Sequence, residues 1–101
     1  MAGAVINPDA SVGDNVIINT GAIIEHDCMI GNHVHVATGA RLAGSIKIGD
    51  GAHVGMGATI REGIRIGRGS TVGAGAVVVH DVPDFVLVVG VPAKVKRGVE
   101  S

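Results

Sequence analysis

The most regular feature of the chain is an aliphatic residue at every sixth position. The residue three positions further on is glycine in seven of the thirteen hexads, so turns recur about once per hexad. A period of six does not match the 3.6-residue period of an amphipathic helix, and it is typical of a short strand followed by a corner. We therefore predict a β-solenoid. The thirteen aliphatic positions are Ile6, Val12, Ile18, Ile24, Ile30, Val36, Leu42, Ile48, Val54, Ile60, Ile66, Val72 and Val78.

Hexads of this kind resemble the hexapeptide-repeat proteins, and the resemblance covers residues 6–83. It implies an all-β fold, a left-handed parallel β-helix with three hexads, or eighteen residues, in each coil. Thirteen hexads then make a little over four coils. We expect residues 1–101 to form a single domain, in which a capping tail at 84–97 covers the last coil, because an open end would expose core side chains and strand edges. Residues 98–101 are expected to be disordered.

Composition and charge narrow the classes of function. The net charge of −1 and the interspersed charges provide no electrostatic footprint for nucleic acid or a membrane surface. Cys28 is the only cysteine, which excludes an intrachain disulfide and fits a reducing compartment. No apolar run reaches the roughly 18 residues that span a bilayer. We expect a cytoplasmic protein whose partners are small molecules or copies of itself.

Oligomerisation is expected from both the size and the surface pattern. A prism of four coils is short for a stable monomer. The outward position before each core aliphatic is apolar at Ile17, Ile23 and Met29 and then polar at His35, Arg41 and Lys47, as expected of a subunit contact near the N-terminal coils. Hexapeptide-repeat proteins are usually homotrimers, and the resemblance implies a homotrimer here.

His26 is the strongest candidate for chemistry. It occupies a corner of the solenoid, and with eighteen residues per coil Gly44 lies beside it on the next coil. A missing side chain next to an exposed imidazole leaves room for a ligand and exposes a backbone amide, which suits a general base and an oxyanion donor. Asp27 follows at the same corner, where it can orient the ring or stabilise its protonated form.

The motif around His26 resembles the catalytic coil of the sialic-acid and bacillosamine-type sugar acetyltransferases. The resemblance rests on Glu25-His26-Asp27-Cys28, on His35 nine residues after His26, and on Leu42-Ala43-Gly44. It implies transfer of acetyl from acetyl-CoA to a hydroxyl or amine of a sugar or nucleotide sugar. His26 would be the general base, by direct attack and without a covalent enzyme intermediate, and Asp27 its acidic partner.

The same resemblance implies a binding site for acetyl-CoA. His35 would contact acetyl-CoA and the Gly44 amide would face the thioester carbonyl. Met56 and Ala74, which are eighteen residues apart, would line the pantetheine groove in a cleft between subunits. The basic residues of the tail, which also resembles the ending of hexapeptide acyltransferases, could meet the CoA phosphates; they are Lys94, Lys96 and Arg97.

Two other functions fit parts of the pattern. A metal-dependent hydratase of the gamma-carbonic-anhydrase kind uses the same solenoid with three histidines around a metal ion. Its two same-chain ligands are typically five residues apart, and no pair among His26, His33, His35 and His53 has that separation, so we expect no metal. The other alternative is a non-catalytic trimeric scaffold. His35 and His53 are eighteen apart, and a surface ladder of histidines is the structural alternative for both.

Overall fold

The computed structural model describes residues 3–99, and these form strands and turns without any helix. No helix in this range could therefore cross a membrane. Most strands are only two residues long. Their bounds are β1 Val5–Ile6, β2 Ser11–Val12, β3 Ile17–Ile18, β4 Ile23–Ile24, β5 Met29–Ile30, β6 His35–Val36, β7 Arg41–Leu42, β8 Lys47–Ile48, β9 His53–Val54, β10 Thr59–Ile60, β11 Arg65–Ile66, β12 Thr71–Val72, β13 Val77–Val78, β14 Val86–Val89 and β15 Lys94–Gly98.

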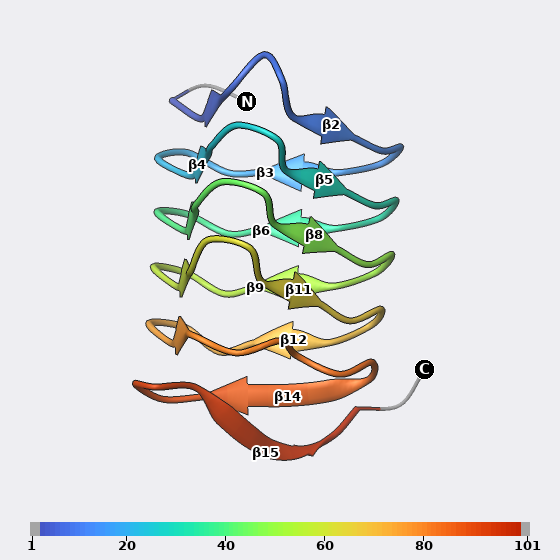
Figure 1. Ribbon diagram of the computed structural model, residues 1–101, viewed down its shortest axis with the longest axis vertical. Helices are drawn as coiled ribbons and strands as arrows, with labels where there is room; N and C mark the ends of the chain where they lie inside the picture. Colours follow the sequence, from blue (N-terminus) through green and yellow to red (C-terminus); the bar gives the residue numbers. More distant parts are fainter. Residues whose placement is uncertain (1–2, 100–101) are drawn as a thin grey trace.

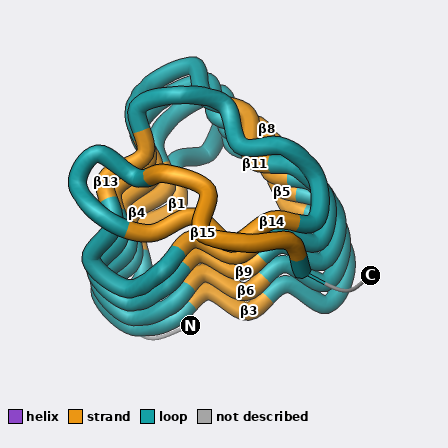
Figure 2. Tube along the Cα trace, turned by 90° about the horizontal axis from the view of Figure 1, so that it is seen from below, coloured by secondary structure: helices purple, strands orange, loops and turns teal. Residues whose placement is uncertain are grey.

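The strands form the three sides of a triangular prism (Figure 2). Side A contains β1, β4, β7, β10 and β13; side B contains β2, β5, β8 and β11; side C contains β3, β6, β9, β12 and β14, followed by β15. Strands of successive coils pair in parallel with an offset of eighteen, as in Val5↔Ile23 and His35↔His53. In Figure 1 the chain passes from β2 in front to β3 behind while it descends, which is the sense of a left-handed coil. The predicted left-handed parallel β-helix is confirmed.

The hexad pattern accounts for the core. In each two-residue strand of the interior coils, the first residue points outward and the second is buried. The buried positions contain aliphatic residues from every sixth position between Ile18 and Val78, together with the small or apolar residues four positions after them. Cys28 is one of these, fully buried, and its thiol donates a hydrogen bond to the carbonyl of Ala43 at 3.1 Å. Burial raises the pKa of this thiol, so Cys28 is a core residue, as expected of its inward position.

The corners follow a second regularity: in eleven of the thirteen hexads the residue three positions after the core aliphatic adopts the left-handed backbone conformation. Glycine occupies seven of these positions, and Asn15, Asp27, His33 and Ser45 occupy four more, with φ between 54° and 61°. Glycine, asparagine and aspartate tolerate this region better than other residues. The corners between sides B and C are also bridged by side chains: Asn32 accepts from the Asp14 amide, and Asp50 from the Asn32 amide, both at 2.8 Å.

The tail adds the third side of a fifth coil and then a hairpin. An isolated bridge between Ile66 and Val82 and the parallel pairing of β14 with β12 continue the solenoid, so it has about five coils. Strand β15 then pairs antiparallel with β14 (Figure 1). The expectation of disorder at 98–101 is wrong for its first two residues, because Gly98 ends β15 and the Val99 amide bonds to the Phe85 carbonyl; residues 100 and 101 lie outside the described range.

Two contacts attach the tail to the last coils. Ser70 is the one polar residue among the fully buried side chains of residues 3–99, and its hydroxyl donates to the Pro83 carbonyl and accepts from the Val86 amide. The Phe85 ring lies over Gly69, where any added Cβ would be 2.5 Å from the ring. These contacts close the end of the solenoid that a plain continuation of the hexads would leave open.

The apolar residues predicted to form one subunit contact do not lie together. Ile17 and Met29 are each 55% exposed and Ile23 is half-buried, but they belong to β3, β5 and β4 on three different sides of the prism. Residues six apart occupy successive sides, so a stripe at this spacing winds around the solenoid. A single contact surface cannot include all three.

Candidate active site

The His26 corner connects side A to side B, between β4 and β5. The His26 side chain is 54% exposed, and its Nδ1 lies 3.2 Å from Oδ2 of Asp27, which is 67% exposed. If Nδ1 carries the hydrogen and donates it to the carboxylate, Nε2 retains its lone pair. Asp27 itself adopts the left-handed backbone conformation at this corner, with a φ of 59°. In that tautomer the free nitrogen is Nε2, on the part of the ring that lies beside Gly44.

Gly44 lies directly against this imidazole. A Cβ at Gly44 would be 2.8 Å from Cε1 and 3.0 Å from Nε2 of His26, so any side chain here would displace the ring. The two coils are joined at this point by a hydrogen bond from the Ser45 amide to the His26 carbonyl at 3.0 Å. Among the hydrogen bonds of residues 3–99, none uses the Gly44 amide as donor. The predicted stacking of Gly44 on His26 agrees with this geometry.

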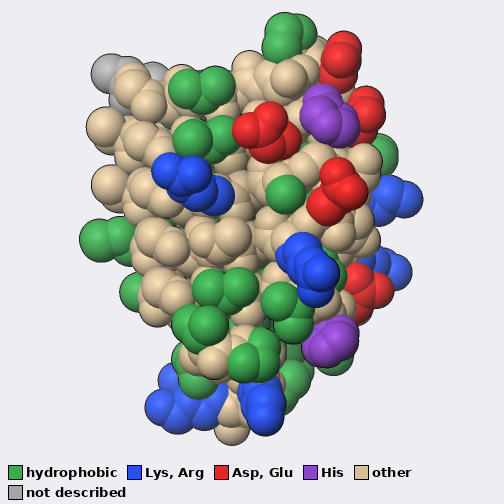
Figure 3. All heavy atoms as spheres, turned by 60° about the vertical axis from the view of Figure 1, so that its left-hand side comes forward, with side chains coloured by type: hydrophobic (Ala, Val, Ile, Leu, Met, Phe, Trp, Pro, Cys, Tyr) green, Lys and Arg blue, Asp and Glu red, His purple; other side chains and the backbone are tan. Residues whose placement is uncertain are grey.

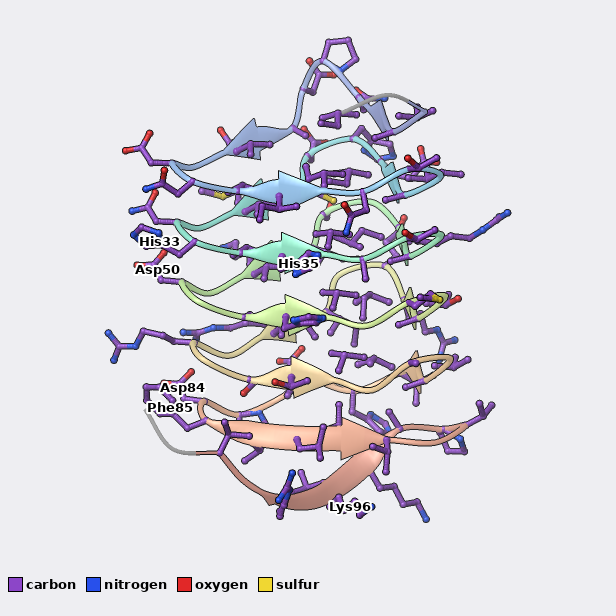
Figure 4. All side chains as sticks on the ribbon, turned by 180° about the vertical axis from the view of Figure 1, so that it is seen from behind. His33, His35, Asp50, Asp84, Phe85 and Lys96 are labelled. Carbon is purple, nitrogen blue, oxygen red and sulfur yellow. The ribbon has the colours of Figure 1, made fainter. Side chains whose placement is uncertain are left out.

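His35 lies on a different part of the surface. It projects outward from β6 on side C (Figure 4), half-buried, and its Nε2 is 2.8 Å from Nδ2 of Asn19. On the other side its ring meets that of His53, with centroids 4.5 Å apart and the planes tilted by 51°. Asn19 was missed by the sequence analysis. Because Ile17 pairs with His35, Asn19 is the diagonal neighbour of His35 across the two strands, and that placement is the signal that could have identified it.

Met56 and Ala74 lie apart from both His26 and His35, at the corner that connects side C to side A. Both are exposed, Met56 by 62%, and the Gly75 amide donates to the Met56 carbonyl at 2.8 Å, which joins their coils. One chain therefore presents His26 and Gly44 at one corner, His35 on side C, and Met56 and Ala74 at another corner. The structure does not bring these predicted residues together within a single chain.

The charges are distributed unevenly along the solenoid axis. Residues 3–40 contain four acidic residues and no lysine or arginine, so all eight basic residues follow from Arg41 onward. Figure 3 shows most of the acidic side chains of one face in its upper half, whereas lysine and arginine side chains extend from the upper middle of that face to its lower end. Lys94, Lys96 and Arg97 are exposed on β15 at that end. The tail thus offers cations to an anionic ligand.

Residues 3–99 include no group of three or more His, Cys, Asp or Glu side chains that could hold a metal ion. Every buried side-chain nitrogen or oxygen in the same range has a hydrogen-bond partner.

The fold, the eighteen-residue coil and the glycine against His26 define a hexapeptide-repeat protein. The sequence model for bacterial transferase hexapeptide proteins, which is built from six repeats, matches residues 9–44 and again residues 45–80. The chain belongs to this family of bacterial hexapeptide transferases. No curated protein sequence matches it significantly.

Several solved structures are similar to the chain. A histidine mutant of perosamine N-acetyltransferase from Caulobacter crescentus, in complex with CoA and GDP-perosamine, is 49% identical, with a TM-score of 0.93 over 95% of this chain and 46% of that protein. The acetyltransferase domain of PglB from Neisseria gonorrhoeae is 37% identical, with a TM-score of 0.85 over 93% of this chain and 55% of that one. Serine acetyltransferase from Neisseria gonorrhoeae is 38% identical, with a TM-score of 0.91 over 98% and 43%.

The chain thus spans about half the length of these proteins. The resemblance to hexapeptide-repeat acyltransferases is confirmed by the family match and by these structures.

Proposed function

We propose that this chain transfers an acetyl group from acetyl-CoA to the amine of a nucleotide-linked amino sugar, with His26 as the general base. The observation that carries the proposal is the His26 corner, where Asp27 orients the imidazole and Gly44 leaves space against it. The 49% identity to a perosamine N-acetyltransferase in complex with CoA and GDP-perosamine supports a sugar amine as the acceptor.

The reaction needs one base and one oxyanion donor. The amine nitrogen attacks the thioester carbonyl, and Nε2 of His26 removes a proton from that nitrogen as the C–N bond forms. The Gly44 amide donates to the oxygen that becomes negative in the tetrahedral intermediate. The intermediate collapses to the amide as the C–S bond breaks, and the imidazolium returns its proton to the CoA thiolate. Asp27 stabilises the imidazolium between these two steps.

The donor site requires a second copy of the chain. His26 and Gly44 lie at one corner of the prism and Met56 and Ala74 at another, and this separation supports a groove between neighbouring copies that is lined by both sets. A homotrimer would repeat this cleft three times by closed symmetry. In such a cleft His35 contacts acetyl-CoA, and the cations of β15 meet its phosphates.

The first experiment replaces His26. His26→Ala should lower kcat by about 10²- to 10⁴-fold with acetyl-CoA and GDP-perosamine as the first acceptor tested, because general base catalysis contributes that much. Acetyl-CoA binding, measured by calorimetry, should change little. His80→Ala is the matched control, because His80 is exposed at the same corner three coils further on and is also followed by an aspartate, Asp81. Equal loss in both variants, or none in His26→Ala, would refute the assignment.

The shared cleft is tested by mixing subunits. His26→Ala and Met56→Arg chains should each be inactive alone, the second because a cation fills the apolar groove. Trimers assembled from both should regain activity in the clefts that combine an intact His26 with an intact Met56. Absence of recovery in mixed trimers of verified composition would place both residues in one chain's site and contradict the intersubunit cleft.

A further inference from the structure

We propose that His53 is the positioning residue for His35, holding its imidazole from the adjacent coil in the orientation that meets acetyl-CoA. This inference rests on the proposed function, since it concerns the donor side of the same site. His53 is a half-buried outward residue of β9, and it pairs in register with His35 of β6.

The contact geometry supports a positioning role. The two ring centroids are 4.5 Å apart with the planes tilted by 51°, within the range of favourable aromatic pairs. On the opposite side of His35, Asn19 lies 2.8 Å from Nε2. The ring is therefore held from both neighbouring coils, by a hydrogen bond on one side and by a ring contact on the other. With the Asn19 amide group as donor, Nε2 accepts, and Nδ1 carries the hydrogen of the neutral ring.

The electrostatics of His53 fit this role. Burial, and then the neighbouring His35, lower the pKa of His53 below its usual value, so at neutral pH it presents an uncharged ring to His35. Strands β6 and β12 flank β9, and their register partners for His53 are His35 and Thr71. His35 is thus the one titratable side chain that faces His53 from these two strands. A protonated His53 would repel a protonated His35, whereas a neutral His53 packs against it in either state.

A plain ladder of exposed histidines is the competing explanation. In that case His53 would affect the donor site only through the stability of the solenoid, and its effect would not depend on His35. A double-mutant cycle separates the two explanations, because residues that act through each other show non-additive effects.

The cycle compares His35→Ala, His53→Ala and the double variant, all as full-length chains whose urea midpoints are measured first. His53→Ala should weaken acetyl-CoA binding by about 2- to 10-fold in calorimetry, the range of an aromatic pair. In the His35→Ala background it should have no further effect. His53→Phe keeps a flat ring of similar size and should retain most of the affinity. Equal losses in both backgrounds, or full affinity in His53→Ala, would overturn the proposal.

A measurement without donor makes this test independent of the proposed function. Imidazole ¹⁵N shifts of the protein alone report which ring nitrogen of His35 carries the proton. In the wild type and in His53→Phe the Asn19 bond should keep one tautomer dominant at pH 8. In His53→Ala the His35 ring loses its support on the other side, so it should leave the Asn19 amide part of the time and the two tautomers should mix. If acetyl-CoA does not bind the wild type, the transferase proposal fails. The tautomer ratio of His35 still tests whether His53 positions the His35 ring. An unchanged ratio in His53→Ala overturns that proposal.

Discussion

Replacing Gly44 by alanine is the sharpest test of how the solenoid builds its site. The new Cβ would lie 2.8 Å from Cε1 of His26, whereas ordinary van der Waals contacts begin at 3.4 Å, so the ring must move by about 0.6 Å to restore an ordinary contact. The obstacle is an exposed side chain at a corner and not backbone. The ring can therefore swing away, and folding should lose little free energy.

Catalysis should be much more sensitive than folding to this displacement. A base that is misplaced by about 1 Å can lose about 10²-fold in rate, and we expect Gly44→Ala to lower kcat by about 10- to 100-fold. The urea midpoint should stay close to that of the wild type. The assay pairs steady-state turnover of acetyl-CoA with denaturation of the same preparation, so that both quantities come from one sample.

Gly49→Ala is the contrasting control. A Cβ there would lie 2.7 Å from the backbone nitrogen of Arg68 and 2.9 Å from its Cα, and neither atom can move without shifting a coil. This variant should lose stability with no specific effect on turnover per folded protein. Full activity in a folded Gly44→Ala, or a loss of stability as large as that of Gly49→Ala, would refute the reasoning.

Two further predictions concern stability. Asp50→Ala removes the carboxylate that accepts from the Asn32 amide at 2.8 Å and should lower the free energy of unfolding by about 0.5–1 kcal/mol in urea titrations, with Asp9→Ala as a control that should change nothing comparable. Folding lowers the pKa of His53 from its usual value of 6.5. Below about pH 6.5 the unfolded chain therefore binds more protons than the folded chain, and the free energy of unfolding should decrease as the pH is lowered. His53→Phe should flatten this slope between pH 7.5 and 5 and His80→Phe should not; equal slopes in the two variants would contradict the assignment of this proton to His53.

The sequence determined the repeating part of the protein. In a solenoid each residue's neighbours are those eighteen positions away, so a local pattern defines long-range contacts once the coil length is known. The buried aliphatics follow from the six-residue period, and the placement of Gly44 against His26 follows from the eighteen-residue offset. The same offset predicts the alignment of His35 with His53.

Only the tertiary structure decided the features that depart from the repeat. Asn19 reaches His35 diagonally, at an offset of sixteen, and therefore outside the eighteen-residue register. Ser70 and Phe85 attach the tail to the last coils through contacts of their side chains. The six-residue period does not continue into the tail, so it could not predict these contacts. The structure also separates His26 from Met56 onto different corners, because a coil turns through three sides, and this separation supports the proposed cleft between neighbouring chains.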